Sequence, residues 1–187
     1  MTYNGTLPKP RVHEPTWGPV RHGHSLFLSI ALAVLFLIVG LAAPTWADYE
    51  AGLQAFSRAD YATALREWRP LAEQGHAEAQ YQLGLLYDFS KGVPQDFATA
   101  RQWYEKAAAQ GHAGAQHNLG GMYEFRHGVT RDDVRAYMWY HLAVGQPNGG
   151  EWRDLAAENR DEIAEHMTSV QIADAKKRAQ EWRPKGK

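Results

Sequence analysis

The sequence predicts an all-α protein, an α/α solenoid of antiparallel helix pairs that follows a single hydrophobic N-terminal helix. The main observation is an internal repeat: residues 64–99 and 100–135 align without a gap and are identical at 15 of 36 positions. Self-similarity at this period is typical of solenoids. Each unit also contains two stretches in which apolar residues recur at helical spacing, which predicts a pair of helices. A continuous apolar run near the N-terminus predicts the separate hydrophobic helix.

The N-terminal segment predicts export of the remaining chain. Residues 1–25 form a short basic leader, and residues 26–43 are an apolar run of 18 residues. A basic flank keeps the N-terminus in the cytoplasm and sends the following chain across the membrane. Residues 26–47 are therefore either a signal peptide cleaved after Ala47 or a transmembrane anchor, and the sequence leaves both open, together with the true translation start.

This segment also sets the expected location. We expect a cell-envelope protein whose periplasmic or exported domain is either released near Ala47 or anchored by a single span with a cytoplasmic N-terminus. Contact with the membrane is expected only through residues 26–47, and only if they are uncleaved. The chain has no cysteine, so neither disulfides nor a lipid-modified cysteine can form.

Residues 48–146 are predicted to form the repeats. In each unit a first helix, 77–87 in the first copy, precedes a second helix at 96–110, which Asp96 caps and Gly111 ends. Gly84 recurs as Gly120 inside the first helices, where glycine costs about 1 kcal/mol relative to alanine. The repetition predicts a close helix crossing there. Gly92 and Gly128 fall in the connecting loops, where a positive φ is expected.

The repeat pattern continues beyond both complete units. Asp60, Tyr61 and Ala64 match the start of the later second helices, so a helix pair is expected to begin at about Asp48. Downstream the register breaks at residues 147–150. Residues 147–187 are then predicted to form polar C-terminal capping helices, the last opening with a capping box from Thr168 to Gln171.

The repeat units resemble a known family. The motifs A-x-A-Q-x-x-L-G-x-x-Y, G-V-x-x-D and W-Y-x-x-A-A-x-Q-G are similar to those of Sel-one-like repeats (SLR), relatives of tetratricopeptide repeats (TPR), over residues 48–187. The resemblance implies a right-handed superhelix that acts as an adaptor for proteins or peptides. Ser90 and Arg126 replace the first glycine of the family's G-x-G-V loop, so the first helices are expected to run slightly longer. A cysteine-rich branch acts on β-lactams, but this chain lacks its cysteines.

Composition and motifs argue against several other classes. Residues 48–187 carry 17 basic and 20 acidic side chains, interspersed along the chain, which disfavours a nucleic-acid binder. The chain has no motif of a serine or cysteine nucleophile and no phosphate-binding loop motif.

The repeated histidines and aromatic residues also have a simpler interpretation. His76 and His112 occupy equivalent positions, which stacked repeats hold about 10 Å apart, too far to share a metal ion. The repeating aromatics Trp68, Trp103, Tyr104, Trp139 and Tyr140 are expected to pack between layers. We therefore expect no enzyme, metal or cofactor.

Positions that differ between the units are candidates for specificity. In solenoids of this kind the first helices line the concave face, so their variable polar residues are the predicted partner contacts: Tyr81, Gln82, Asp88, His117, Asn118 and Glu124. Positions that repeat are predicted to be structural: Ala79, Leu83, Gly84, Tyr87, Gly92, Ala115, Leu119, Gly120, Tyr123 and Gly128.

The predicted function is a non-enzymatic adaptor or scaffold module of the cell envelope that holds another protein or a peptide on its concave surface. Two alternatives from other classes stay open at this point, an exported cell-wall hydrolase and a purely structural or inhibitory domain. The sequence names neither the partner nor the oligomeric state.

Overall fold

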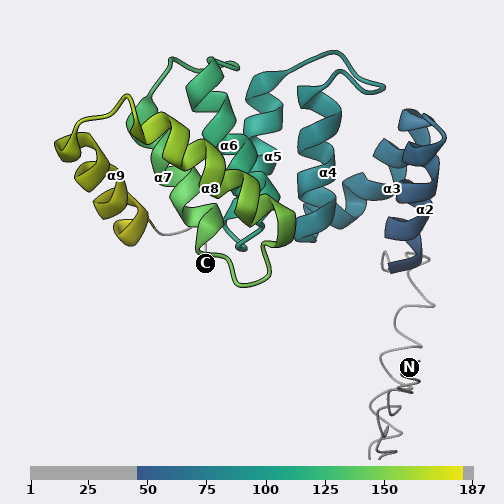
Figure 1. Ribbon diagram of the computed structural model, residues 1–187. Coiled ribbons are helices and arrows are strands. Elements are labelled where there is room, and N and C mark those ends of the chain that lie inside the picture. The colour runs from purple at the N-terminus through teal and green to yellow at the C-terminus, as the bar shows by residue number, and fades with distance from the viewer. Residues whose placement is uncertain (1–45, 183–187) are drawn as a thin grey trace, which may run out of the picture. The chain divides into compact units, whose positions relative to one another are not determined.

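The computed structural model describes residues 46–182, and all regular structure within this range is α-helical. The predicted leader, hydrophobic helix and extreme C-terminus lie outside the described residues. The described helices are α2 (Trp46–Ser57), α3 (Tyr61–Glu73), α4 (Ala77–Asp88), α5 (Phe97–Ala108), α6 (Ala113–Phe125), α7 (Asp133–Val144), α8 (Gly150–Ala164) and α9 (Ser169–Glu181) (Figure 1). Within the same range no helix is long and apolar enough to cross a bilayer.

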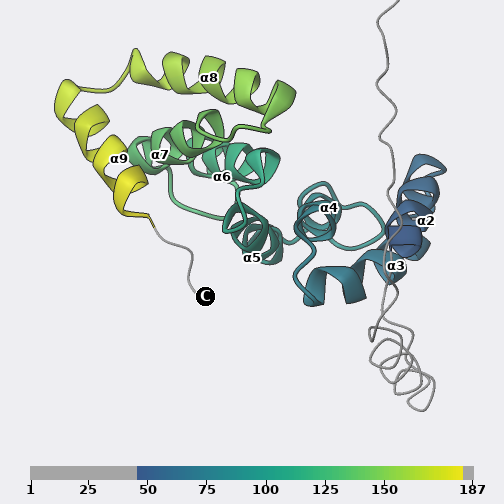
Figure 2. The same cartoon turned by 90° about the horizontal axis from the view of Figure 1, so that it is seen from below.

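The helices pack as sequential antiparallel pairs. α2–α3, α4–α5 and α6–α7 are the pairs, and each pair packs on the next one along the chain (Figures 1 and 2). The all-α repeat fold is thus confirmed, as is the extra helix pair expected to begin at about Asp48. The two C-terminal helices depart from a simple stack, because α8 packs on both α6 and α7 and α9 packs on α7.

Close approach of each first helix to an aromatic ring of the second holds the pairs together. A Cβ atom added at Gly84 would lie 2.3 Å from Cε1 of Tyr104, and one added at Gly120 would lie 2.5 Å from Cε1 of Tyr140. Both tyrosines are fully buried. The predicted close crossing is confirmed. The α2–α3 pair has its own version, in which a Cβ atom at Gly52 would lie 2.2 Å from Nε1 of Trp68.

The other repeated positions are also structural. Ala79, Leu83, Ala115 and Leu119 are almost fully buried, while Tyr87 and Tyr123 each contact an arginine through the hydroxyl group. Gly92 and Gly128 have φ angles of +71° and +67°, as expected for these loops. A Cβ atom at either glycine would lie 2.5 Å from the Cβ atom of the residue that opens a second helix. These two loops therefore need glycine for both space and conformation.

Helix starts follow the predicted caps. The carboxylates of Asp60, Asp96 and Asp132 accept backbone N–H groups of α3, α5 and α7. His76 and His112 cap α4 and α6 through Nδ1, which accepts the N–H groups of Ala79 and Ala115 at 3.2 and 3.1 Å. The capping box that opens the last helix is present at Thr168 and Gln171. The repeated histidines thus have a structural role at the helix starts.

The two loops that depart from the family pattern keep the glycine backbone conformation. Ser90 and Arg126 have φ angles of 55° and 65°, in the left-handed region that glycine adopts without penalty. Arg126 is exposed, and it ends α6 as its C-cap residue. The helices α4 and α6 end at Asp88 and Phe125, slightly beyond the predicted limit.

Arg126→Gly is expected to raise the free energy of unfolding by about 0.5–1 kcal/mol. The substitution removes left-handed strain of about 1–2 kcal/mol, part of which the greater entropy of glycine in the unfolded chain offsets. Chemical denaturation of the full chain measures the change. Gly128→Ala, two residues further along the same loop, should destabilise instead, and a loss of stability in Arg126→Gly would contradict this account of the loop.

The buried side chains form two clusters that meet within α4. Leu83 and Leu86 belong to the N-terminal cluster with Trp68, whereas Tyr81 belongs to the C-terminal cluster with Tyr104. Each layer is therefore buried mainly by its neighbours, as in other solenoids. α4 links the two cores and also carries several of the predicted partner contacts.

Candidate functional site

The face of α4 and α6 that carries Tyr81, Gln82, His117 and Asn118 is the surface on which we expected a partner. We call it the inner face. The structure places part of α8 against it. Trp152 of α8 lies with its ring centroid 6.0 Å from that of Tyr81 and 5.3 Å from that of His117. The C-terminal region thus covers part of this face, in addition to capping the end of the solenoid (Figure 2).

Tyr81 is held within the fold. Its side chain is buried, and its ring stacks on that of His112 with centroids 4.3 Å apart. Burial raises the pKa of its hydroxyl group, and the negative charges of Glu78, Glu151 and Asp88 add to this effect. Tyr81 therefore stays neutral at physiological pH, and only 6% of its surface is exposed.

His117 and Asn118 are partly buried and hydrogen-bonded. Nδ1 of His117 lies 3.1 Å from Oδ1 of Asn118, and Nε2 lies 3.0 Å from Nδ2 of Asn159 on α8. An amide NH₂ group can only donate, so Nε2 accepts and the proton sits on Nδ1. Burial lowers the pKa of His117, which favours this neutral form. His117 therefore joins α6 to α8, and Asn118 holds its ring in place.

Asp88 and Glu124 make equivalent hydrogen bonds in the two units. The carboxylate of Asp88 accepts the hydroxyl of Tyr104 at 3.0 Å, and that of Glu124 accepts the hydroxyl of Tyr140 at 2.6 Å. Each bond ties the end of a first helix to the middle of a second helix. Although the residue type differs between units, the chemistry is the same, so comparison of the units by identity does not reveal this structural role.

Asp88→Asn is expected to stabilise the protein at pH 7 by up to about 1 kcal/mol, because asparagine keeps an acceptor for Tyr104 and removes a buried charge at a helix C-terminus. Burial raises the pKa of Asp88. The native state therefore binds its proton more tightly than the unfolded state, and this group's contribution to stability falls as pH rises through that raised pKa. Denaturation of the wild type and of Asp88→Asn at pH 3 and pH 7 tests this. The stabilisation by Asp88→Asn should be smaller at pH 3, and equal stabilisation at both pH values would contradict this account.

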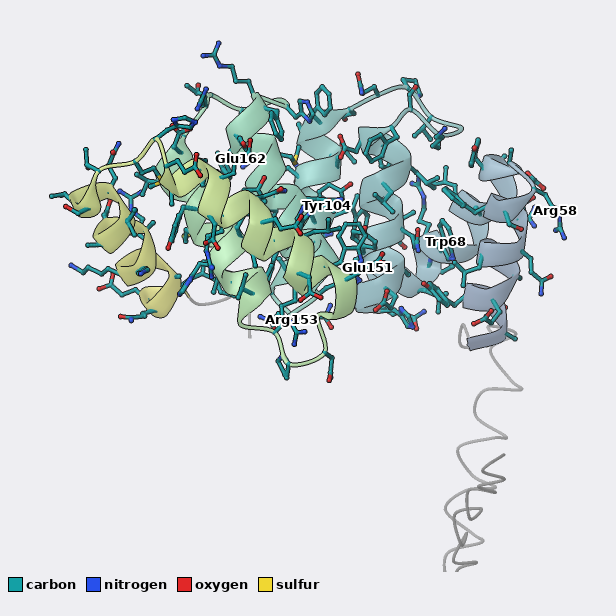
Figure 3. The ribbon with its side chains drawn as sticks, viewed as in Figure 1. Arg58, Trp68, Tyr104, Glu151, Arg153 and Glu162 are labelled. Atoms are coloured by element: carbon teal, nitrogen blue, oxygen red, sulfur yellow. The ribbon has the colours of Figure 1, made fainter. Side chains whose placement is uncertain are left out.

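A pocket of about 500 Å³ lies where the first turns of α4, α6 and α8 meet. We call it the inner-face pocket. Its walls include the predicted contacts Tyr81 and Gln82, and its volume is that of a small-ligand or side-chain site. Further walls come from residues that the sequence did not single out as contacts, namely Glu78, His112, Gln146 and Trp152. Figure 3 shows Glu151 at the start of α8.

The pocket contains an acid and an imidazole in contact, but the pair is not arranged for proton transfer. Nε2 of His112 lies 3.0 Å from Oε2 of Glu78, while Nδ1 accepts the N–H group of Ala115. The cap requires an unprotonated Nδ1, so the neutral ring carries its proton on Nε2 and donates it to Glu78. His112 therefore has no free lone pair with which to act as a base. This geometry favours binding over catalysis.

Several residues that line the pocket were not predicted as contacts from the sequence, for a physical reason. Trp152 and Gln146 flank residues 147–150, where the repeat register breaks, and no second unit exists there for comparison. The available signal was an aromatic residue, Trp152, directly after this break in a largely polar segment. Of the six predicted contacts, Tyr81 and Gln82 line the pocket. Asp88, Glu124 and His117 form hydrogen bonds to other helices, and Asn118 is hydrogen-bonded to His117. The role of all six in partner binding stays a prediction.

The paired helices and the repeated packing positions define a TPR-related helical repeat protein. A Sel1 repeat model matches residues 77–112 and 113–147. A Sel1 repeat protein from Oxalobacter formigenes is 32% identical, with a TM-score of 0.53, over 62% of this chain and 86% of that one. The chain belongs to the Sel1-like repeat (SLR) family.

A second solved structure is similar over a longer part of this chain. It is a protective antigen of uropathogenic Escherichia coli strains that displays an SLR fold, with 29% identity and a TM-score of 0.65. The match covers 72% of this chain but 29% of the antigen, so this chain spans less than a third of that protein's length. No curated protein matches the chain significantly.

Proposed function

We propose that this protein is a non-enzymatic adaptor of the cell envelope that holds a peptide segment of a partner protein in the inner-face pocket. SLR repeats typically mediate protein interactions, and no catalytic motif was found in the sequence. The observation that carries the proposal is the pocket itself. It opens on the face where this fold class is expected to bind partners, and its lining combines repeated positions such as His112 with residues that do not repeat, such as Glu78, Tyr81 and Trp152.

The chemistry of the pocket walls suits a peptide. The side-chain amides of Gln82, Gln110, Gln146 and Asn148 each carry donors and an acceptor, which an extended backbone requires. Gln110 and Gln146 each already donate one hydrogen bond within the fold, to Gln80 and to the Leu142 carbonyl. Trp152 supplies a half-buried aromatic surface, the kind of residue that dominates binding energy in protein interfaces. The walls come from helix starts that internal packing fixes, so little ordering is needed on binding.

The envelope location is part of the same proposal. Its support is the apolar run at residues 26–43 with its basic flank, which predicts that residues after 47 reach the periplasm or beyond. Fractionation with N-terminal sequencing of the mature protein tests it. A mature start at Asp48 would indicate a released domain, an intact N-terminus in the membrane fraction would indicate an anchor, and a full-length protein in the cytoplasm would refute export.

Trp152→Ala is expected to weaken binding of the partner about 30-fold, the loss of about 2 kcal/mol that is common for a central interface tryptophan. The partner is first isolated by pull-down from envelope extract with the full chain and then titrated by calorimetry. Trp103→Ala is the matched control, because Trp103 is also half-buried but lies on α5, outside the pocket.

Circular dichroism of both variants checks that the fold is kept. Unchanged affinity in a folded Trp152→Ala variant would rule out the pocket as the binding site. Failure of any protein or peptide to bind the wild-type chain would favour a purely structural domain.

A further inference from the structure

The inner-face pocket has an acidic rim. Glu78 lines it at the first turn of α4, and its side chain is 51% exposed. Glu151 does not line the pocket itself but precedes the lining residue Trp152 in the first turn of α8. Burial raises the pKa of the Tyr81 hydroxyl, and the charge of Glu151, like that of Glu78, raises it further. Among the described residues that line the pocket, none is lysine or arginine. Arg153 also lies near the start of α8, but its guanidinium pairs with Asp154 at 3.2 Å.

Glu78 is held in its charged form with capacity left for a ligand. The hydrogen bond from His112 lowers the pKa of Glu78, so its carboxylate is ionised at physiological pH. That bond uses Oε2 at 3.0 Å, and a carboxylate can accept several further donors. The fixed position of His112 at the α6 cap orients Glu78 before any partner arrives.

Helix dipoles partly oppose this negative charge. The N-termini of α4, α6 and α8 each contribute a partial positive charge of roughly half a unit close to the pocket. Glu78 and Glu151 carry a full negative charge each on the first turns of α4 and α8, and α6 has no acidic residue in its first turn. The balance is therefore modestly negative, which favours a cation held at the rim over an anion.

The walls next to this rim are aromatic. The rings of Tyr81 and Trp152 meet edge to face with centroids 6.0 Å apart, and both line the pocket. Lysine and arginine combine a long apolar stem, which packs on such surfaces, with a charged head that an aromatic ring also attracts. An acidic rim above aromatic walls is complementary to both parts of such a side chain.

We propose that the inner-face pocket selects a basic side chain, arginine or lysine, of the bound peptide, with Glu78 and Glu151 receiving its charged head and Trp152 its stem. This inference rests on the proposed peptide-binding function and names its specificity. A peptide with an acidic or neutral residue at that position would lose the ionic contact and leave the two glutamates unpaired.

The test is a selection of random displayed peptides on the purified full chain. Peptides bound by the wild type should be enriched in arginine and lysine at one position at least fivefold over the starting library. The Glu78→Gln/Glu151→Gln variant should lose this enrichment while still selecting peptides. Glutamine retains an acceptor for His112, so the α6 cap is kept. Glu158→Gln, an exposed α8 site outside the pocket, is the control and should retain the enrichment.

A double-mutant cycle on the best peptide then separates charge recognition from general binding. Replacing the peptide's basic residue by glutamine and replacing both Glu78 and Glu151 by glutamine should each weaken binding about tenfold, and together no more than either alone. This inference would be overturned if the selected peptides showed no enrichment in arginine or lysine, or if that enrichment persisted in Glu78→Gln/Glu151→Gln. Either result would still be compatible with peptide binding in the pocket. If the wild type selects no peptide and captures no partner, the proposed function fails and the inference fails with it.

Discussion

Gly120→Ala should lower the free energy of unfolding by about 1–2 kcal/mol, although alanine is the better helix former. The new Cβ atom would lie 2.5 Å from Cε1 of Tyr140, a separation that real contacts do not show. Tyr140 has no room to move, because it is fully buried and its hydroxyl is bonded to Glu124. Overpacking of a rigid core typically costs 1–3 kcal/mol or more, which exceeds the gain of about 1 kcal/mol in helix propensity.

The neighbouring glycine provides the control. A Cβ atom at Gly121 would lie 3.7 Å from the Tyr140 hydroxyl, an ordinary contact, so Gly121→Ala should raise stability by up to about 1 kcal/mol. Urea denaturation of both variants measures the two changes. Similar stability in Gly120→Ala and Gly121→Ala would contradict the account of the helix crossing, and Gly84→Ala should behave as Gly120→Ala does.

Trp68→Ala should destabilise the first helix pair by about 3–5 kcal/mol, the usual range for deletion of a fully buried aromatic side chain. The indole packs between the rings of Tyr49 and Phe56 and donates to the Tyr49 carbonyl at 3.2 Å. The N-terminal cluster depends on this residue, whereas the C-terminal cluster does not contain it. Because a solenoid is stabilised layer by layer, α2 and α3 should unfold while α5 to α9 stay folded.

Hydrogen exchange resolved along the chain measures this difference. Amides of α2 and α3 should lose protection in Trp68→Ala, and those of α6 and α7 should keep it. Trp103→Ala is the control, because Trp103 is only half-buried and should cost about 1 kcal/mol. Uniform loss of protection from α2 to α9 would show that the layers unfold together.

The repeat architecture could be predicted because its determinants are local and occur twice. Glycines at the crossings, aspartates at the caps and aromatics at the pair interfaces each have a physical reason that a single sequence displays. Repetition did not always mean burial, however. Phe89 and Phe125 are identical in the two units, yet their exposed fractions are 59% and 62%. Sequence comparison between units therefore cannot distinguish a packed position from a repeated surface position.

The candidate site was less predictable because it depends on contacts that are distant in sequence. His117 bonds to Asn159, 42 residues further along the chain, and Trp152 reaches back to Tyr81 on α4. No local pattern reveals that α8 packs against the inner face. The paired bonds of Asp88 and Glu124 escaped for a different reason, since two different residue types perform the same task in the two units.

The most direct test of the account is a hydrogen-exchange footprint of the bound partner on the full chain. The first backbone amides of α4, α6 and α8 have no partner within the helix, so they should exchange readily in the free protein, whereas the Ala79 and Gln80 amides are already hydrogen-bonded. We predict that the partner slows exchange at residues 77–78, 113–114 and 150–152, and leaves exchange in α3 unchanged. Protection confined to α3 and α5, with none at the three helix starts, would contradict the claim that the inner-face pocket is the binding site.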